Sequence, residues 1–91
     1  MTAFAPPQTP LETELVAIWR EMLRVDRVGI DDDFFDLGGH SLLGIKMLAI
    51  VHESTGVRLH LRRLAEEPTI RALAAAITAA PRDETVAAPT A

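Results

Sequence analysis

The sequence predicts an all-α protein, a small bundle of three long helices and one short helix with a long loop between the first two helices. Two observations favour this class. Apolar residues recur at helical spacing in three separate segments, and no segment shows the sustained alternation that a half-buried strand requires. The length of 91 residues and the absence of cysteine also limit the chain to one small domain without disulfides or cysteine-based metal sites.

The folded unit is expected over residues 9–80. Residues 1–8 and 81–91 are rich in Ala, Pro and Thr and contain few large apolar side chains, so both are expected to be flexible tails. The first helix is predicted from Pro10 to Leu23 or Arg24, because Thr9, Pro10 and Glu12 form an N-terminal capping pattern. Its apolar stripe comprises Leu11, Leu15, Ile18, Trp19, Met22 and Leu23.

Between residues 25 and 40 neither the helical nor the strand period holds. This segment contains three glycines, five aspartates and scattered large apolar residues. Loops of this length are uncommon in compact domains and are usually functional. The apolar residues are expected to pack the loop across the helices, with Phe34 and Phe35 as its anchor.

Three further helices are predicted: Ser41 to Thr55 with Gly56 as its C-terminal cap, a short turn over Leu61–Ala65, and a last helix capped by Thr69. The second of the four has apolar residues on two sides, so it is either buried all round or apolar towards a partner. The side expected in the core comprises Leu43, Met47, Ile50 and Val51. The other side comprises Ser41, Leu42, Ile45, Ala49 and His52, with Leu48 between the two.

The junction before Ser41 has unusual chemistry. Gly38 and Gly39 free the backbone and leave no side chains in the way of a close approach. They deliver Ser41 to the first turn of a helix, where unpaired N–H groups and the helix dipole would stabilise a phosphate on its oxygen. The alternative is that Ser41 is only an N-terminal cap, although Gly44 stands where a capping box has Glu or Gln. The residues alone leave these two interpretations evenly balanced.

The run from Asp33 to Leu42, DFFDLGGHSL, closely resembles the signature of peptidyl carrier proteins, the thiolation domains of nonribosomal peptide synthetases. The resemblance continues through Pro68-Thr69-Ile70 and Leu73-Ala74. It implies that a dedicated transferase esterifies Ser41 with 4′-phosphopantetheine from coenzyme A, at a site that includes Gly38, Gly39 and His40. The thiol of this arm would then carry aminoacyl or peptidyl groups as thioesters, and the chain itself would be a non-catalytic carrier.

The resemblance also implies where partners bind. In the family they contact the second helix, the loop before it and the short third helix. The corresponding candidates here are Leu37, Leu42, Ile45, Lys46, Leu64 and Ala65, beside His40. The expected partners are a phosphopantetheinyl transferase and adenylation, condensation, thioesterase or tailoring enzymes. The family commonly has Phe at the position of Ala65, so the contact there is expected to differ.

Two alternatives to a peptidyl carrier stay open on the sequence. The nearest is an acyl carrier protein of polyketide or fatty-acid synthesis, but those usually have Asp before the serine, where this chain has His40. They also have an acidic second helix, whereas in this chain the charges of Lys46 and Glu53 on that helix cancel. The other alternative is an unmodified all-α interaction module in which Ser41 caps a docking helix.

Composition and spacing disfavour other classes of function. Nine basic against 13 acidic residues give a net charge of −4, which argues against a duplex nucleic-acid binder. There is neither an apolar run near the ~18 residues of a membrane span nor a signal-peptide pattern. We therefore expect a cytoplasmic monomer that binds neither nucleic acid nor membranes. The spacing of the acids and histidines matches no calcium or zinc motif, and Asp31-Asp32-Asp33 is expected to be solvated.

Overall fold

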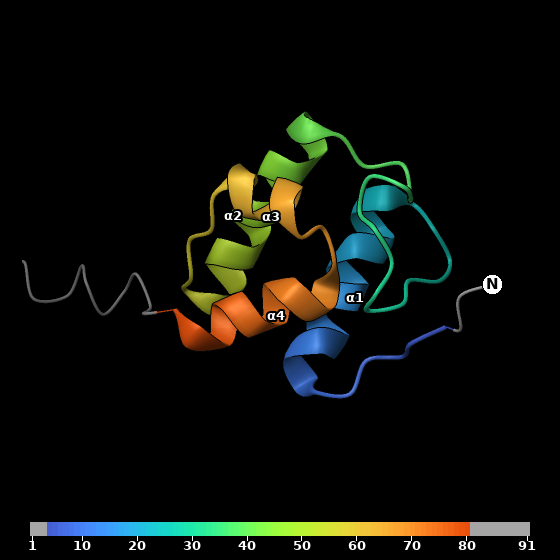
Figure 1. Ribbon diagram of the computed structural model, residues 1–91, viewed down its shortest axis with the longest axis horizontal. Coiled ribbons are helices and arrows are strands. Elements are labelled where there is room, and N and C mark those ends of the chain that lie inside the picture. Colours follow the sequence, from blue (N-terminus) through green and yellow to red (C-terminus); the bar gives the residue numbers. More distant parts are fainter. Residues whose placement is uncertain (1–3, 81–91) are drawn as a thin grey trace, which may run out of the picture.

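Four helices make up the part of the chain that the computed structural model describes, residues 4–80, and this part contains no strand. They are α1 (Pro10–Leu23), α2 (Ser41–Thr55), α3 (Leu61–Glu66) and α4 (Ile70–Ala79). Helix α1 packs against both α2 and α4, and the short α3 packs on α2 (Figure 1). A long loop joins α1 to α2. The predicted all-α class, with three longer helices and one short helix, is confirmed.

Helix α1 begins and ends at the residues that carry its local signals. The hydroxyl of Thr9 accepts a hydrogen bond of 3.1 Å from the N–H of Glu12, and Pro10 occupies the first helical position. The Glu12 carboxylate accepts the N–H of Gln8 at 2.8 Å, one residue earlier than in the usual reciprocal capping box. Arg24 ends the helix in the left-handed conformation, at a φ of 56°.

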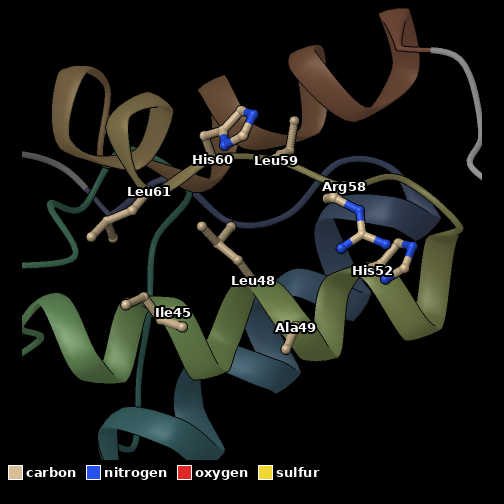
Figure 2. Close-up of a pocket in the computed structure, with 8 residues that line it drawn as sticks. All are labelled: Ile45, Leu48, Ala49, His52, Arg58, Leu59, His60 and Leu61. Atoms are coloured by element: carbon tan, nitrogen blue, oxygen red, sulfur yellow. The ribbon is translucent and has the colours of Figure 1, made fainter.

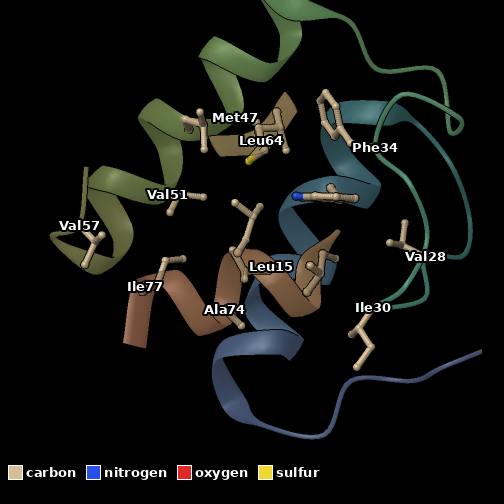
Figure 3. Packing of buried hydrophobic residues seen from close by; sticks show 14 residues of the cluster. Leu15, Val28, Ile30, Phe34, Met47, Val51, Val57, Leu64, Ala74 and Ile77 are labelled. Carbon is tan, nitrogen blue, oxygen red and sulfur yellow. The ribbon is translucent and has the colours of Figure 1, made fainter. Parts of the chain in front are cut away.

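The core lies between the helices and includes part of the loop (Figure 3). Trp19 of α1 and Phe34 of the loop pack edge to face, with ring centroids 5.1 Å apart. Val28 and Ile30 of the loop are also buried, so the loop is pinned across the bundle as predicted. The expected aromatic anchor is only half correct, because Phe34 is fully buried whereas Phe35 remains 36% exposed.

The buried side of α2 differs from the predicted one. Ile50, expected in the core, is 39% exposed, and Leu43 is only half-buried. Leu48, expected at the boundary, is buried instead. The reason is that α3 and the loop pack against the side of α2 that includes Gly44 and Leu48. The buried residues of α2 are Gly44, Met47, Leu48, Val51 and Thr55.

The chain before α1 contacts the long loop. We call residues 4–8 the N-terminal strap. The carbonyl oxygen of Ala5 accepts a hydrogen bond of 2.8 Å from the N–H of Ile30, and the Arg27 guanidinium lies 4.0 Å from the centroid of the Phe4 ring. A Cβ on Gly29 would lie 3.2 Å from the Phe4 ring and 3.3 Å from the Ala5 backbone. Residues 4–8 of the expected N-terminal tail over residues 1–8 therefore contact the loop. The rest of that tail, residues 1–3, and the expected C-terminal tail over residues 81–91 lie outside the described residues.

The same loop is also tied to the start of α4. The carbonyl oxygen of Ile30 accepts the N–H of Arg71 at 2.9 Å, and the Arg71 guanidinium donates two hydrogen bonds to the Asp31 carboxylate, at 2.7 and 2.9 Å. These hydrogen bonds, with the charge of Arg71, hold the pKa of Asp31 below its ordinary value, and Asp31 in turn raises the pKa of Arg71.

The Asp31–Arg71 pair predicts a pH dependence of stability. A carboxyl whose pKa is lowered by folding adds stability above its unfolded pKa, ordinarily 3.8, and loses it as the pH falls through the folded pKa. Asp31→Asn should therefore lower the thermal midpoint at neutral pH, and the difference should vanish in acid. It will be small, because the two side chains are 45% and 55% exposed. Thermal unfolding of both proteins from neutral to acid pH checks this, and a difference that grows on acidification would contradict it.

Candidate functional site

The two glycines before α2 are required for different reasons. Gly38 has a φ of +106°, which side-chain-bearing residues rarely adopt, and nothing lies within 4 Å of where its Cβ would be. At Gly39 the limit is space, since a Cβ there would lie 2.3 Å from Cε2 of Phe34. The N–H of Gly39 also donates to the carbonyl oxygen of Phe34 at 3.0 Å. The junction thus follows the surface of the buried Phe34.

His40, and not Ser41, caps α2. The His40 backbone is extended, its Nδ1 accepts the N–H of Leu43 at 3.3 Å, and its carbonyl oxygen accepts the N–H of Gly44 at 2.8 Å. Ser41 is the first residue inside the helix. The interpretation of Ser41 as the N-terminal cap is therefore wrong, because His40 already performs that role. The sequence offered no signal for this, since histidine is not among the preferred capping residues.

Ser41 is exposed at the N-terminal tip of α2. Among the described residues, neither its hydroxyl nor its N–H has a hydrogen-bond partner, and the N–H of Leu42 has none either. These two N–H groups lie at the positive end of the helix dipole. The site can therefore present an alcohol to another protein and stabilise a phosphate placed on it.

Large apolar side chains flank Ser41 on the exposed side of α2. Leu42 is 58% exposed and Ile45, one turn further along, is 52% exposed. Lys46 and Ala65 are also exposed, and Leu37 is half-buried. The structure thus places most of the expected partner-contacting residues where another protein can reach them.

Leu64 is the exception among these residues. It is fully buried, and its Cδ2 would lie 2.9 Å from a Cβ on Gly44. It packs α3 against the first turn of α2 and is not accessible to a partner. The expectation of a direct partner contact at Leu64 is corrected accordingly. In a six-residue helix, the sequence could not show which of two neighbouring residues, Leu64 or Ala65, would point inwards.

A groove of about 370 Å³ runs beside α2 and was not predicted. Ile45 and Leu61 lie at one end of it, and His52 and Arg58 lie at the other end (Figure 2). The connector between α2 and α3 forms its second wall. No sequence signal pairs that connector with α2, because the contact depends on how the chain crosses the helix. The groove is lined by Ile45, Leu48, Ala49, His52, Arg58, Leu59, His60 and Leu61.

The aspartates of the loop bind the backbone. Asp32 accepts the N–H of Gly29 at 2.8 Å, and Asp33 accepts those of Phe35 and Asp36 at 2.8 and 3.1 Å. With Asp31 paired to Arg71, the acidic run shapes the loop, while Asp31 stays exposed and Asp32 and Asp33 stay half-buried. Residues 4–80 hold no cluster of three or more His, Asp or Glu suited to a metal ion. Within the same range, every helix is too short or too polar to cross a bilayer.

Known proteins are similar to this chain in both sequence and fold. The chain matches the family described as phosphopantetheine attachment site over residues 13–77. It is 44% identical over 78 residues to surfactin synthase subunit 1 of Bacillus subtilis (strain 168), an alignment that covers 86% of this chain and 2% of that protein. The chain therefore spans a small fraction of this relative's length.

Solved structures give the same result. One match lies in the structure of the phosphopantetheine transferase Sfp in complex with coenzyme A and a peptidyl carrier protein. It has a TM-score of 0.80 and 38% identity and covers 86% of this chain and 100% of that one. The solution structure of a prototype peptidyl carrier domain of modular peptide synthetases matches with a TM-score of 0.74 and 40% identity, over 82% of this chain and 99% of that one.

These matches confirm the resemblance seen in the DFFDLGGHSL run. The chain belongs to the phosphopantetheine attachment-site family, and it is homologous to the non-catalytic peptidyl carrier domains of nonribosomal peptide synthetases.

Proposed function

We propose that the chain carries aminoacyl or peptidyl groups as thioesters on a 4′-phosphopantetheine arm attached to Ser41, in the synthesis of a nonribosomal peptide. The family carries this arm on a serine, and the chain has only two serines, Ser41 and Ser54. The hydroxyl of Ser54 donates a hydrogen bond to the carboxylate of Glu14. Ser54 also lies in the last turn of α2, where the helix dipole disfavours a phosphate. The hydroxyl of Ser41 has no such hydrogen bond within the described residues, and Ser41 lies in the first turn of α2, so we assign the attachment to Ser41.

The residues around Ser41 fit the phosphopantetheine group. The exposed hydroxyl is open to a transferase, and the N–H groups of Ser41 and Leu42 are available to the phosphate oxygens. Gly38 and Gly39 add no side chains on the approach to the attachment point. When bound, the arm supplies the thiol that forms the thioester.

Attachment of the arm requires only the alcohol of Ser41 from this chain. The oxygen of Ser41 forms a bond to the coenzyme A phosphorus that bears the pantetheine, and the bond from that phosphorus to the nucleotide half breaks. The hydroxyl proton leaves to a base. His40 is a poor candidate for that base, because its Nδ1 already accepts the N–H of Leu43. We therefore assign the base to the transferase and the presentation of the alcohol to this chain.

Intact-mass measurement tests the assignment. The chain is incubated with coenzyme A and a broad-specificity phosphopantetheinyl transferase, alongside Ser41→Ala and the matched control Ser54→Ala. The wild type and Ser54→Ala should each gain the mass of one phosphopantetheinyl group, and Ser41→Ala should gain nothing. An unmodified wild type, or a Ser41→Ala variant that still gains the group, would overturn the proposal.

The exposed residues near Ser41 support a common docking face for partners. We define this face by Leu37, His40, Leu42, Ile45, Lys46 and Ala65, of which Leu42 and Ile45 supply the largest exposed apolar area. Its occupants would be the transferase first and then adenylation, condensation, thioesterase or tailoring enzymes in turn. Because coenzyme A is the donor of the arm, we place these steps in the cytoplasm.

A further inference from the structure

We propose that Phe34 is a positioning residue for the transfer of the arm to Ser41. Phe34 does not touch the reacting atoms. Its ring supports the backbone on both sides of Ser41 and so fixes where the hydroxyl is presented. This inference rests on the proposed attachment of the arm at Ser41.

The Phe34 ring is immobilised by its surroundings. It is fully buried and lies edge to face with Trp19, at 5.1 Å between centroids and 71° between planes. Phe35 packs edge to face on it as well, at 5.4 Å and 88°. The N–H of Phe34 donates to the carbonyl oxygen of Pro68 at 2.8 Å. The ring is thereby held against α1, and the backbone that carries it is held against the segment before α4.

One edge of this ring faces the residues before and after Ser41. A Cβ on Gly39, two residues before the serine, would lie 2.3 Å from Cε2 and 2.5 Å from Cδ2 of Phe34. A Cβ on Gly44, three residues after the serine, would lie 3.6 Å from the same Cε2. The backbone therefore approaches the ring so closely at Gly39 that only glycine fits, and at Gly44 the ring lies at ordinary van der Waals distance from a Cβ. The tight contact at Gly44 is with Leu64.

Ser41 has few other restraints. Its side chain is exposed, and within residues 4–80 its hydroxyl and N–H have no hydrogen-bond partner. Its position follows from the backbone at Gly39 and Gly44, and hence from the ring beneath them. A displacement of about 1 Å at a reacting group can lower a rate by about a hundredfold. A smaller or more mobile side chain at position 34 should therefore slow the transfer even when the domain remains folded.

The test separates positioning from stability. Steady-state transfer from coenzyme A by a phosphopantetheinyl transferase is measured for the wild type, for Phe34→Leu and for Ile77→Ala. Ile77 is a buried residue of α4 at the opposite end of the core from Phe34 (Figure 3), so Ile77→Ala serves as a destabilised control. All assays are run at a temperature at which unfolding curves show every variant to be folded.

Phe34→Leu should lower kcat by about tenfold or more, because the hydroxyl is no longer held in place. KM should change little, because the exposed Leu42 and Ile45 of the docking face are untouched. Ile77→Ala should show wild-type kcat and KM despite its lower thermal midpoint. If Phe34→Leu does not fold, Phe34→Met replaces it, since methionine better conserves the buried volume.

A compensating variant provides a second readout. Gly39→Ala places a methyl group against the ring and should also lower kcat. In Phe34→Leu/Gly39→Ala the methyl group still lies about 2.7 Å from the carbonyl oxygen of residue 34, but its clash with the ring is gone. The relief of the ring clash alone should make kcat exceed the product of the two single effects. Multiplicative effects in the double variant would overturn the proposal.

Two further outcomes are distinguishable. If the wild type is modified at Ser41 and Phe34→Leu retains the kcat of Ile77→Ala, only the positioning role of Phe34 fails. If the wild type is not modified, or if the Ser41→Ala variant is still modified, the proposed attachment at Ser41 is wrong and this inference fails with it.

Discussion

Replacing Trp19 by alanine is expected to destabilise the domain by about 3–5 kcal/mol. Trp19 is the largest of the fully buried side chains, and it packs edge to face on Phe34. The substitution would leave a cavity between α1 and the loop and would remove the aromatic pair. Domains of this size have about 5–15 kcal/mol of stability, so a large part of it would be lost. Urea unfolding followed by far-ultraviolet circular dichroism measures the change.

Trp19→Phe is the matched control, and two effects oppose each other in it. It loses buried volume, but it keeps a ring against Phe34 and removes the indole Nε1. That atom is buried and has no hydrogen-bond partner in the part of the chain described by the structure. An unpaired buried donor costs about 1–3 kcal/mol, which offsets part of the lost packing. Trp19→Phe should thus lose less than half of what Trp19→Ala loses, and equal losses would contradict this account of the core.

Ile45→Asp should lower kcat/KM for transfer of the arm by at least about tenfold while leaving the free energy of unfolding within about 0.5 kcal/mol of the wild type. Ile45 is 52% exposed one turn after Ser41, so little packing within the domain depends on it. A charge there would be buried without a partner when an enzyme covers the docking face. Transfer kinetics and thermal unfolding, measured on the same preparations, check both halves of the prediction.

Ile50→Asp is the control for that experiment. Ile50 is 39% exposed on the same helix, five residues further along and therefore about 140° around the helix axis from Ile45. The same charge at this position should leave transfer unchanged. A comparable loss of transfer in both variants would show that the effect does not depend on the docking face, and a large fall in the thermal midpoint of Ile45→Asp would place Ile45 in the core.

The parts of the fold that local chemistry determines were predictable from the sequence. The hydroxyl of Thr9 and the proline after it set the start of α1, and Gly56 sets the end of α2 in the left-handed conformation. An aromatic anchor at Phe34-Phe35 was predictable, because a loop of this length needs a large buried side chain to pack, but the sequence did not show that Phe34 alone would be buried. Ser41 was identified through the glycine pair and through the family resemblance of the run around it.

The remaining features depend on tertiary contacts. Helix α2 is apolar on most sides, so its sequence pattern does not indicate which side faces the core. Contacts with α3 and the loop bury Leu48 and leave Ile50 exposed. The cap at His40 depends on a side-chain rotamer that brings Nδ1 to the N–H of Leu43. The inward orientation of Leu64 likewise depends on the space that Gly44 leaves.

The N-terminal strap affects how this unit should be transplanted into another assembly. If a chimeric boundary is drawn at Thr9, where the sequence pattern begins, the acceptor for the N–H of Ile30 and the aromatic ring against Arg27 are both left behind. The loop that leads to Ser41 would then lack its attachment to the N-terminal strap in the recombined protein. A junction placed upstream of Phe4 keeps the contacts of Phe4 and Ala5 with that loop in the recombined protein.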